Sequence, residues 1–123
     1  MLLDSNIIIY SAKREHAKLR RFINENPCSV SDVSRIEVLG YHLLSEKERE
    51  YLEEFFDAAN LLTICDSVID QAVQLRQIRR MSLGDAIVAG TALAHQLELV
   101  TRNVGDFNWI ESLSLIDPFE ILS

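Results

Sequence analysis

Short apolar runs alternate with longer amphipathic stretches along the chain, a pattern typical of an α/β protein. The short runs are rich in Leu, Ile and Val and predict strands, whereas the longer stretches repeat their apolar positions at helical spacing. The predicted strands comprise residues 2–3, 28–30, 61–65, 97–101 and, as a possible fifth, 115–116. The predicted helices comprise residues 12–26, 32–44, 45–59, 66–80 and 82–96.

Capping and breaking residues set several of these boundaries. Pro27 ends the first long helix, and Ser45 with Glu48 three residues later forms a capping box at the start of another. Asp66 is expected to cap the helix that follows it. The run 7–10 is open to two interpretations, because its β-branched residues fit either a tight helical turn or a continuation of the first strand.

Strands that alternate with helices of this length predict right-handed crossovers and a parallel sheet covered on both faces. We therefore expect a three-layer α/β/α fold with a mainly parallel central sheet. The chain has 123 residues and 48% hydrophobic content, which suits a single domain over residues 1–123.

Composition narrows the class of protein without deciding its function. The net charge of −7 argues against a nucleic-acid partner, but most of the 12 basic residues fall in two clusters. Cys28 and Cys65 lie in or at the end of strand-like runs without metal-ligand spacing, and we expect both to be buried thiols. No apolar run approaches the ~20 residues of a membrane span, and the first residues carry no signal-peptide core. We therefore expect a cytoplasmic protein with no membrane partner.

Four acidic residues lie next to apolar runs at widely spaced positions: Asp4, Glu37, Asp85 and Asp106. Ligands of parallel α/β sheets bind at the carboxyl ends of the strands, so we expect these carboxylates to converge on one crevice. Carboxylates that lie this close together repel and destabilise one another unless a cation lies among them. Oxygen ligands without His or Cys favour Mg²⁺ or Mn²⁺ over zinc. The sequence thus predicts a metal-dependent enzyme, with Asp4 and Asp85 as direct ligands.

Each of these acids also has a purely structural interpretation as a helix or turn cap. The capping patterns are Asp4 and Asp106 before turns, with Ser34-x-x-Glu37 and Ser82-x-x-Asp85 as potential capping boxes. A structural α/β domain whose acids are all caps is therefore one alternative. The three histidines lack ligand spacing, and the chain has no P-loop, glycine-rich nucleotide motif or nucleophile elbow.

Four motifs, in this order, carry a family resemblance. They are Leu3-Asp4-Ser5-Asn6, Ser34-x-x-Glu37, Gly84-Asp85-Ala86-Ile87-Val88-Ala89 and Thr101-Arg102-Asn103-x-x-Asp106-Phe107. Over nearly the whole chain the sequence resembles the PIN-domain family and, more narrowly, VapC-type toxins. The resemblance implies a Mg²⁺- or Mn²⁺-dependent endoribonuclease, the toxin of a type II toxin–antitoxin pair. Its catalytic, metal-binding acids match Asp4, Glu37, Asp85 and Asp106.

The same resemblance implies further site residues and partners. Many relatives carry an Asp where this chain has Asn103, so Asp106 is expected to complete the acidic set while Asn103 and Thr101 shape the site without charge. Ser5, Asn6 and Thr101 are expected to orient the acidic ligands. The implied partners are a second copy of the chain, in a homodimer, and a cognate antitoxin that blocks the site.

The two basic clusters are expected to hold RNA phosphates, in contacts that position a strand without reading its sequence. The clusters are Lys13, Arg14, Lys18, Arg20 and Arg21 in the 12–26 helix, and Arg76, Arg79 and Arg80 before Asp85. The expected RNA-binding residues among them are Arg14, Lys18, Arg21, Arg76, Arg79 and Arg80. Two alternatives stay open. A DNA-directed or flap-type nuclease uses the same chemistry, and a non-catalytic binding module would use the acidic crevice only to dock its antitoxin.

Overall fold

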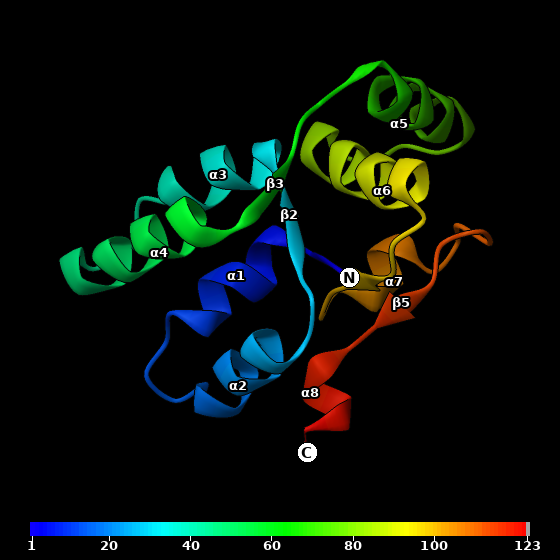
Figure 1. Cartoon of the computed structure of the whole chain (residues 1–123). Coiled ribbons are helices and arrows are strands. Elements are labelled where there is room, and N and C mark those ends of the chain that lie inside the picture. The colour runs from blue at the N-terminus through cyan, green and yellow to red at the C-terminus, as the bar shows by residue number, and fades with distance from the viewer. Residues whose placement is uncertain (123) are drawn as a thin grey trace.

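The computed structural model describes residues 1–122, which form a parallel sheet of five short strands flanked by helices (Figure 1). The strands are β1 (Leu2–Leu3), β2 (Ser29–Ser31), β3 (Asn60–Leu62), β4 (Leu99–Val100) and β5 (Leu115–Ile116). Their order across the sheet is β3-β2-β1-β4-β5, and every pairing is parallel. The predicted parallel sheet is confirmed, including its fifth strand.

The helices largely follow the predicted pattern. They are α1 (Ser5–Ser11), α2 (Ala17–Glu25), α3 (Asp32–Leu39), α4 (Glu46–Ala58), α5 (Asp66–Ile78), α6 (Leu83–His95), α7 (Val104–Phe107) and α8 (Pro118–Ile121). The run 7–10 is helical within α1, so the alternative of a longer first strand is wrong. At α4 the predicted capping box forms: Ser45 Oγ accepts from the Glu48 N–H at 3.1 Å, and Glu48 Oε1 accepts from the Ser45 N–H at 2.9 Å.

Two predicted helices are shorter than the apolar pattern suggested. The predicted 12–26 helix begins only at Ala17, because the Arg20 guanidinium donates to the carbonyls of Ser11 and Lys13 and holds the preceding residues in a turn. The predicted 32–44 helix ends at Leu39, where the poor helix former Gly40 follows as the C-cap.

The region around the third strand also differs from the prediction. The strand occupies residues 60–62 instead of 61–65, so Cys65 lies beyond it and serves as the N-cap of α5, with Asp66 as the first helical residue. Cys65 is exposed and Cys28 is only half-buried, so the prediction of two buried thiols is wrong. A similar shortening leaves the fourth strand at residues 99–100 instead of 97–101.

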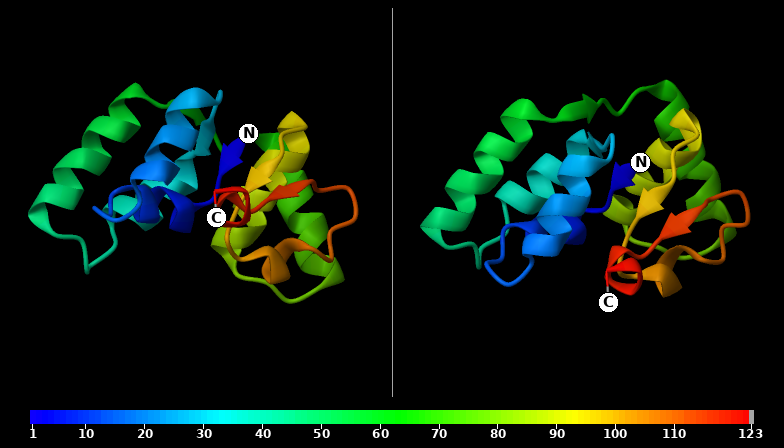
Figure 2. Two further views of the ribbon diagram at one scale, coloured as in Figure 1. Left: turned by 90° about the horizontal axis from the view of Figure 1, so that it is seen from below. Right: turned by 60° about the horizontal axis from the view of Figure 1, so that its bottom comes forward.

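Two hydrophobic cores lie on opposite faces of the sheet. Successive strand residues point to opposite faces. Leu2 and Leu99 accordingly pack in a core with α5 and α6, whereas Leu3 and Val100 pack in a second core with α1 to α4. Both views in Figure 2 show the strands between these two groups of helices. The predicted three-layer α/β/α architecture is thus confirmed.

The strand order creates a switch point beside β1. From β1 the chain moves to β2 and β3 on one side and later to β4 and β5 on the other. Connections leave in opposite directions at such a point and open a crevice at the carboxyl ends of the strands. No helix within residues 1–122 combines the length and the apolar character required to cross a lipid bilayer.

Candidate active site

Asp4 and Thr101 lie at the switch point, each directly after its strand. Leu3 of β1 pairs with Val100 of β4, so the next residue of each strand meets the other across the sheet edge. The Thr101 hydroxyl donates to Asp4 Oδ2 at 2.9 Å, and both side chains are buried. Asp4 occupies the N-cap position of α1, yet its carboxylate makes no capping hydrogen bond to that helix. The capping interpretation of Asp4 is therefore wrong.

Burial of the Asp4 carboxylate perturbs its protonation. Its pKa is raised from 3.8 to about 6, chiefly by desolvation and further by the negative charges of Asp85 and Glu37. The hydrogen bond from Thr101 acts in the opposite direction and lowers the pKa. A buried carboxyl group with like charges nearby is a high-energy arrangement, and such groups concentrate at functional sites.

A chain of hydroxyl groups holds the Glu37 carboxylate. Ser5 Oγ lies 2.7 Å from Glu37 Oε1 and 2.9 Å from Ser34 Oγ. A hydroxyl has one proton and a carboxylate only accepts, so Ser5 donates to Glu37 and accepts from Ser34. Ser34 therefore does not cap α3, whose N-cap is Ser31, and the proposed Ser34–Glu37 capping box is wrong.

Asp85 reaches the same edge from a helix instead of a strand. It lies in the first turn of α6, which runs back toward β4, and the Ser82 side chain caps this turn by accepting from the Asp85 N–H at 3.1 Å. The pKa of Asp85 is raised, first by desolvation and then by the charges of Asp106 and Glu37, while its hydrogen bond with Ser82 lowers it. The predicted 82–96 helix thus forms and carries Asp85, and half of the predicted Ser82 capping box forms.

Glu37 and Asp85 meet at a glycine. A Cβ built on Gly84 would collide with the Glu37 carboxylate at Oε2. The absent side chain of Gly84 therefore leaves room for Glu37 directly beside Asp85. This role of Gly84 was not foreseen, although its place next to Asp85 in the motif was visible in the sequence.

Asp106 lies at the outer side of this group, on the short helix α7. It is exposed, and its N–H donates to the Asn103 carbonyl at 3.0 Å. Asn103 is tied to the buried edge because its N–H donates to Thr101 Oγ1 at 3.0 Å. Asp106 makes no side-chain cap of α7, whose N-cap is Asn103. Its charge nevertheless contributes to the raised pKa of Asp85.

The four acids thus form one electrostatically connected group. The charges of Asp85 and Glu37 raise the pKa of Asp4, and the charges of Glu37 and Asp106 raise the pKa of Asp85. Within residues 1–122, no three His, Cys, Asp or Glu side chains lie close enough to form a complete ligand cage. The donor set still fits Mg²⁺, which prefers oxygen and typically uses one or two carboxylates together with water and substrate phosphate. Asp4 and Asp85 would be the two carboxylates that hold such an ion.

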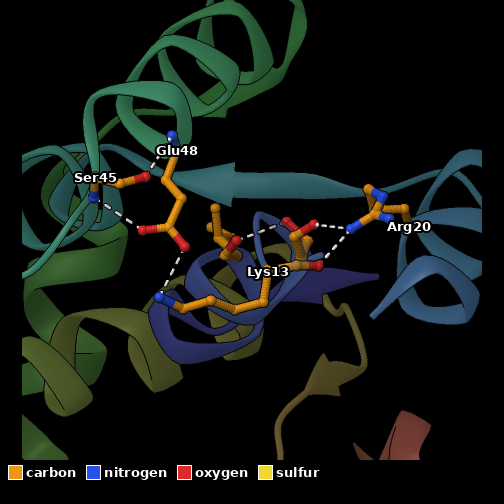
Figure 3. Close-up of polar contacts among 6 residues, drawn as sticks. Lys13, Arg20, Ser45 and Glu48 are labelled. Carbon is orange, nitrogen blue, oxygen red and sulfur yellow. Dashed lines mark hydrogen bonds and ion pairs between the residues drawn. The ribbon is translucent and has the colours of Figure 1, made fainter. Parts of the chain in front are cut away.

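The predicted basic clusters divide into anchored and available side chains. The Lys13 ammonium pairs with Glu48 Oε2 at 2.8 Å, and Arg20 bonds three backbone carbonyls, so both hold the turn after α1 (Figure 3). The predicted RNA-binding residues are all exposed: Arg14, Lys18, Arg21, Arg76, Arg79 and Arg80. Among them, Arg79 lies over the Trp109 ring at 5.5 Å. The first cluster does not lie on one helix as predicted, because α2 starts at Ala17 and leaves Lys13 and Arg14 in the turn before it.

Arg102, inside the last motif, received no role from the sequence. Its guanidinium carbon lies 4.3 Å from the centre of the Phe119 ring and 5.5 Å from that of Tyr10. Arg102 therefore connects the turn after β4 to α8 and to α1 by cation–π contacts. Neither ring neighbours Arg102 in sequence, so nothing in the motif indicated this contact.

Comparisons with known proteins agree with this fold. The sequence model of the PIN domain matches residues 1–108. A toxin–antitoxin complex from Klebsiella pneumoniae contains a chain with 29% identity and a TM-score of 0.72, over 95% of this chain and 96% of that one. A DNA-bound VapBC from Salmonella typhimurium matches at 22% identity and a TM-score of 0.81, over 94% and 96%.

FitAcB from Neisseria gonorrhoeae matches at 20% identity and a TM-score of 0.75, over 96% of this chain and 97% of that one. The two similarities below 25% identity establish the fold alone. No curated protein sequence matches the chain. The family match covers all four acidic motifs, and the chain therefore belongs to the PIN domain family.

Proposed function

We propose that this protein is a Mg²⁺- or Mn²⁺-dependent endoribonuclease and the toxin of a type II toxin–antitoxin pair, of the VapC type. The observation that carries the proposal is the connected group of four acids at the switch point, with the pKa of buried Asp4 raised to about 6. A fold gains nothing in stability from such crowding. A divalent cation would offset the repulsion among the carboxylates and give the group a catalytic role.

Asp4 and Asp85 are the proposed direct ligands, and Glu37 and Asp106 would bind a second ion or hold water. When bound, the cation lowers the pKa of water at the site and stabilises charge that develops on a phosphodiester. Thr101 keeps Asp4 oriented through its 2.9 Å hydrogen bond, and Ser5 does the same for Glu37 at 2.7 Å. Asn103 supports this arrangement through its backbone bond to Thr101.

The available basic side chains are the proposed contacts to RNA phosphates. They compensate locally for a chain whose net charge is −7. The proposed protein partners are a cognate antitoxin and a second copy of the chain in a homodimer. The first is supported by the toxin–antitoxin complex from Klebsiella pneumoniae at 29% identity. We place this activity in the cytoplasm, where RNA is the available substrate.

Cleavage of matched single-stranded RNA and DNA, with Mn²⁺ or with EDTA, tests the proposal. We expect wild-type protein to cut the RNA only with the metal and the Asp85→Asn variant to lose the activity while keeping its circular dichroism spectrum. Preferential cutting of the DNA would favour a DNA-directed nuclease. Absence of cleavage together with absence of metal binding at ~millimolar Mn²⁺ would favour a non-catalytic binding module.

A further inference from the structure

A hollow of about 350 Å³ opens beside the acidic group, between α1 and the end of α3. Ser5 and Glu37 line the end at the start of α1, and Lys13 lines the other end, just beyond α1. The rest of the lining is Asn6, Ile9, Tyr10 and Tyr41. Its volume falls in the ~300–1,000 Å³ range of small-ligand pockets. We call it the Tyr41 hollow. It begins at the proposed reaction site, so whatever lies in it is adjacent to the bond that is cut.

The far end of the Tyr41 hollow presents a fixed positive charge. Lys13 Nζ is held by Glu48 Oε2 at 2.8 Å, and Figure 3 shows the side chain extending from the turn after α1 to α4. An ammonium group has three donors, and Glu48 takes one of them. Tyr41 lies close enough to Lys13 to contribute to the raised pKa of the lysine, after the larger effect of Glu48. A phosphate at this end would meet an immobilised cation.

The lining of the Tyr41 hollow also offers groups suited to a nucleobase. Asn6 is exposed, and its amide makes no hydrogen bond with any other part of residues 1–122. An amide supplies a donor and an acceptor side by side, which matches the edge of a base. The Tyr41 ring contacts His42 at a centroid distance of 5.5 Å and an interplanar angle of 69°. Aromatic rings beside single-stranded nucleic acid are stacking platforms for bases.

We propose that the Tyr41 hollow binds one unpaired nucleotide of the RNA substrate next to the scissile phosphate. Its base packs on Tyr41 and meets Asn6, and its distal phosphate binds Lys13. This inference rests on the proposed ribonuclease function and adds a requirement for a single-stranded, unstacked base at one position. Duplex RNA cannot present a base in this way, because its bases are stacked and paired.

A second hollow, of about 640 Å³, lies beyond the Lys13–Glu48 pair and supplies matched controls. Tyr51 lines it, on the acidic helix α4. Neither Ser5 nor Glu37 lines this hollow, so it does not adjoin the acidic group directly. Tyr51→Leu is therefore a tyrosine substitution of the same size outside the proposed nucleotide site.

Abasic scanning tests the base contact. A short fluorescent single-stranded oligoribonucleotide is prepared with one base removed at each position in turn. Its binding is measured by anisotropy in Ca²⁺, a hard dication that takes oxygen ligands in looser geometry than Mg²⁺.

We expect wild type and Tyr51→Leu to lose roughly tenfold in affinity at one abasic position, as stacking energies indicate. The Tyr41→Leu variant should bind the intact strand as weakly as wild type binds the abasic strand. Removing the base should then cause no further loss of affinity in this variant. An equal abasic penalty in Tyr41→Leu and wild type, or no penalty at any position, would overturn the proposal.

Glu48→Gln separates a phosphate contact of Lys13 from a structural role. Gln at this position keeps the capping box with Ser45 but removes the charge that pairs with Lys13. We expect Lys13→Gln to weaken RNA binding several-fold and Glu48→Gln to leave it unchanged or tighter. Equal weakening by both variants would show that Lys13 acts only through its ion pair and would overturn its assignment. Failure of the ribonuclease proposal has a different signature, namely no RNA cleavage by wild type with Mn²⁺.

Discussion

Thr101 Oγ1 donates a 2.9 Å hydrogen bond to Asp4 Oδ2, which joins two buried residues that lie 97 positions apart in the sequence. The bond connects the ends of the two strands that flank the switch point, β1 and β4. It also stabilises the ionised form of Asp4 against the desolvation that raises its pKa. The same hydrogen bond therefore joins β1 to β4 at the sheet edge and favours the charged carboxylate that would bind a cation.

Thr101→Val removes this hydrogen bond while keeping the shape of the side chain. We expect the pKa of Asp4 to rise further above about 6, because the side-chain hydrogen bond that lowers it is lost. The free energy of unfolding should fall by at least about 1–3 kcal/mol at neutral pH, the usual cost of a buried hydrogen-bond acceptor that loses its donor. Carboxyl-carbon NMR titration of Asp4 measures the shift. An unchanged pKa would remove Thr101 from this role.

The metal-free protein should lose stability as the pH rises from about 4 to about 7. The folded-state pKa of Asp4 is about 6, against the ordinary value of 3.8 that applies in the unfolded chain, so the folded state binds this proton more tightly. The resulting stabilisation is complete below the unfolded pKa and is lost as the pH rises through the folded one, a change of about 3 kcal/mol. Asp85, whose pKa is also raised, acts in the same direction.

Urea unfolding across this pH range measures the effect, with Asp4→Asn as the comparison. Because Asn carries no titrating group, the variant should show a shallower pH dependence and greater stability than wild type at pH near 7. A variant with the wild-type pH dependence would show that Asp4 does not titrate in this window.

Gly84→Ala should impair cleavage without unfolding the protein. The added methyl group would meet the Glu37 carboxylate, a flexible side chain that can move away from Asp85. In a helix, Ala is favoured over Gly by about 0.5–1 kcal/mol, which offsets part of the strain. Gly105→Ala is the matched control, because a Cβ there meets nothing within 4 Å. We expect RNA cleavage to fall at least roughly tenfold for Gly84→Ala. Equal rates for the two variants would contradict the placement of Glu37 beside Asp85.

Arg80→Ala tests the proposed phosphate contacts. Arg80 is exposed, just before the α6 turn that carries Asp85. We expect weaker RNA binding regardless of sequence and a slope of log affinity against log salt that is lower by about 1. Arg49→Ala is the control, because Arg49 lies on the acidic helix α4 and donates to the Leu39 carbonyl at 3.2 Å. The same slope for Arg80→Ala as for wild type would exclude Arg80 as a phosphate contact.

The sequence predicted the features that depend on local pattern. The alternation of strands and helices, the capping box of Ser45 and Glu48, and the position of Asp4 after the first strand follow from residue spacing. The parallel sheet followed from the alternation of strands with helices, because a helical crossover joins parallel strands.

Features that depend on tertiary contacts were not predictable. Asp85 lies beside Glu37 because the Glu37 carboxylate packs against Gly84, and Ser34 hydrogen-bonds Ser5 instead of capping a helix. Local capping patterns and site geometry compete for the same hydroxyl groups, and only the packed fold decides between them. Likewise, Arg20 donates to carbonyl groups of a turn, in a segment where the apolar pattern had predicted a helix.

A titration of Mn²⁺ followed by electron paramagnetic resonance tests the central claim, that the acids at the switch point together bind a divalent cation. The free-ion signal should disappear on binding to wild type at or below ~millimolar Mn²⁺. Asp4→Asn and Asp85→Asn should each bind at least roughly tenfold more weakly, because each removes one direct ligand. Undiminished free-ion signal with wild type, or equal affinity in both variants and wild type, would contradict the claim.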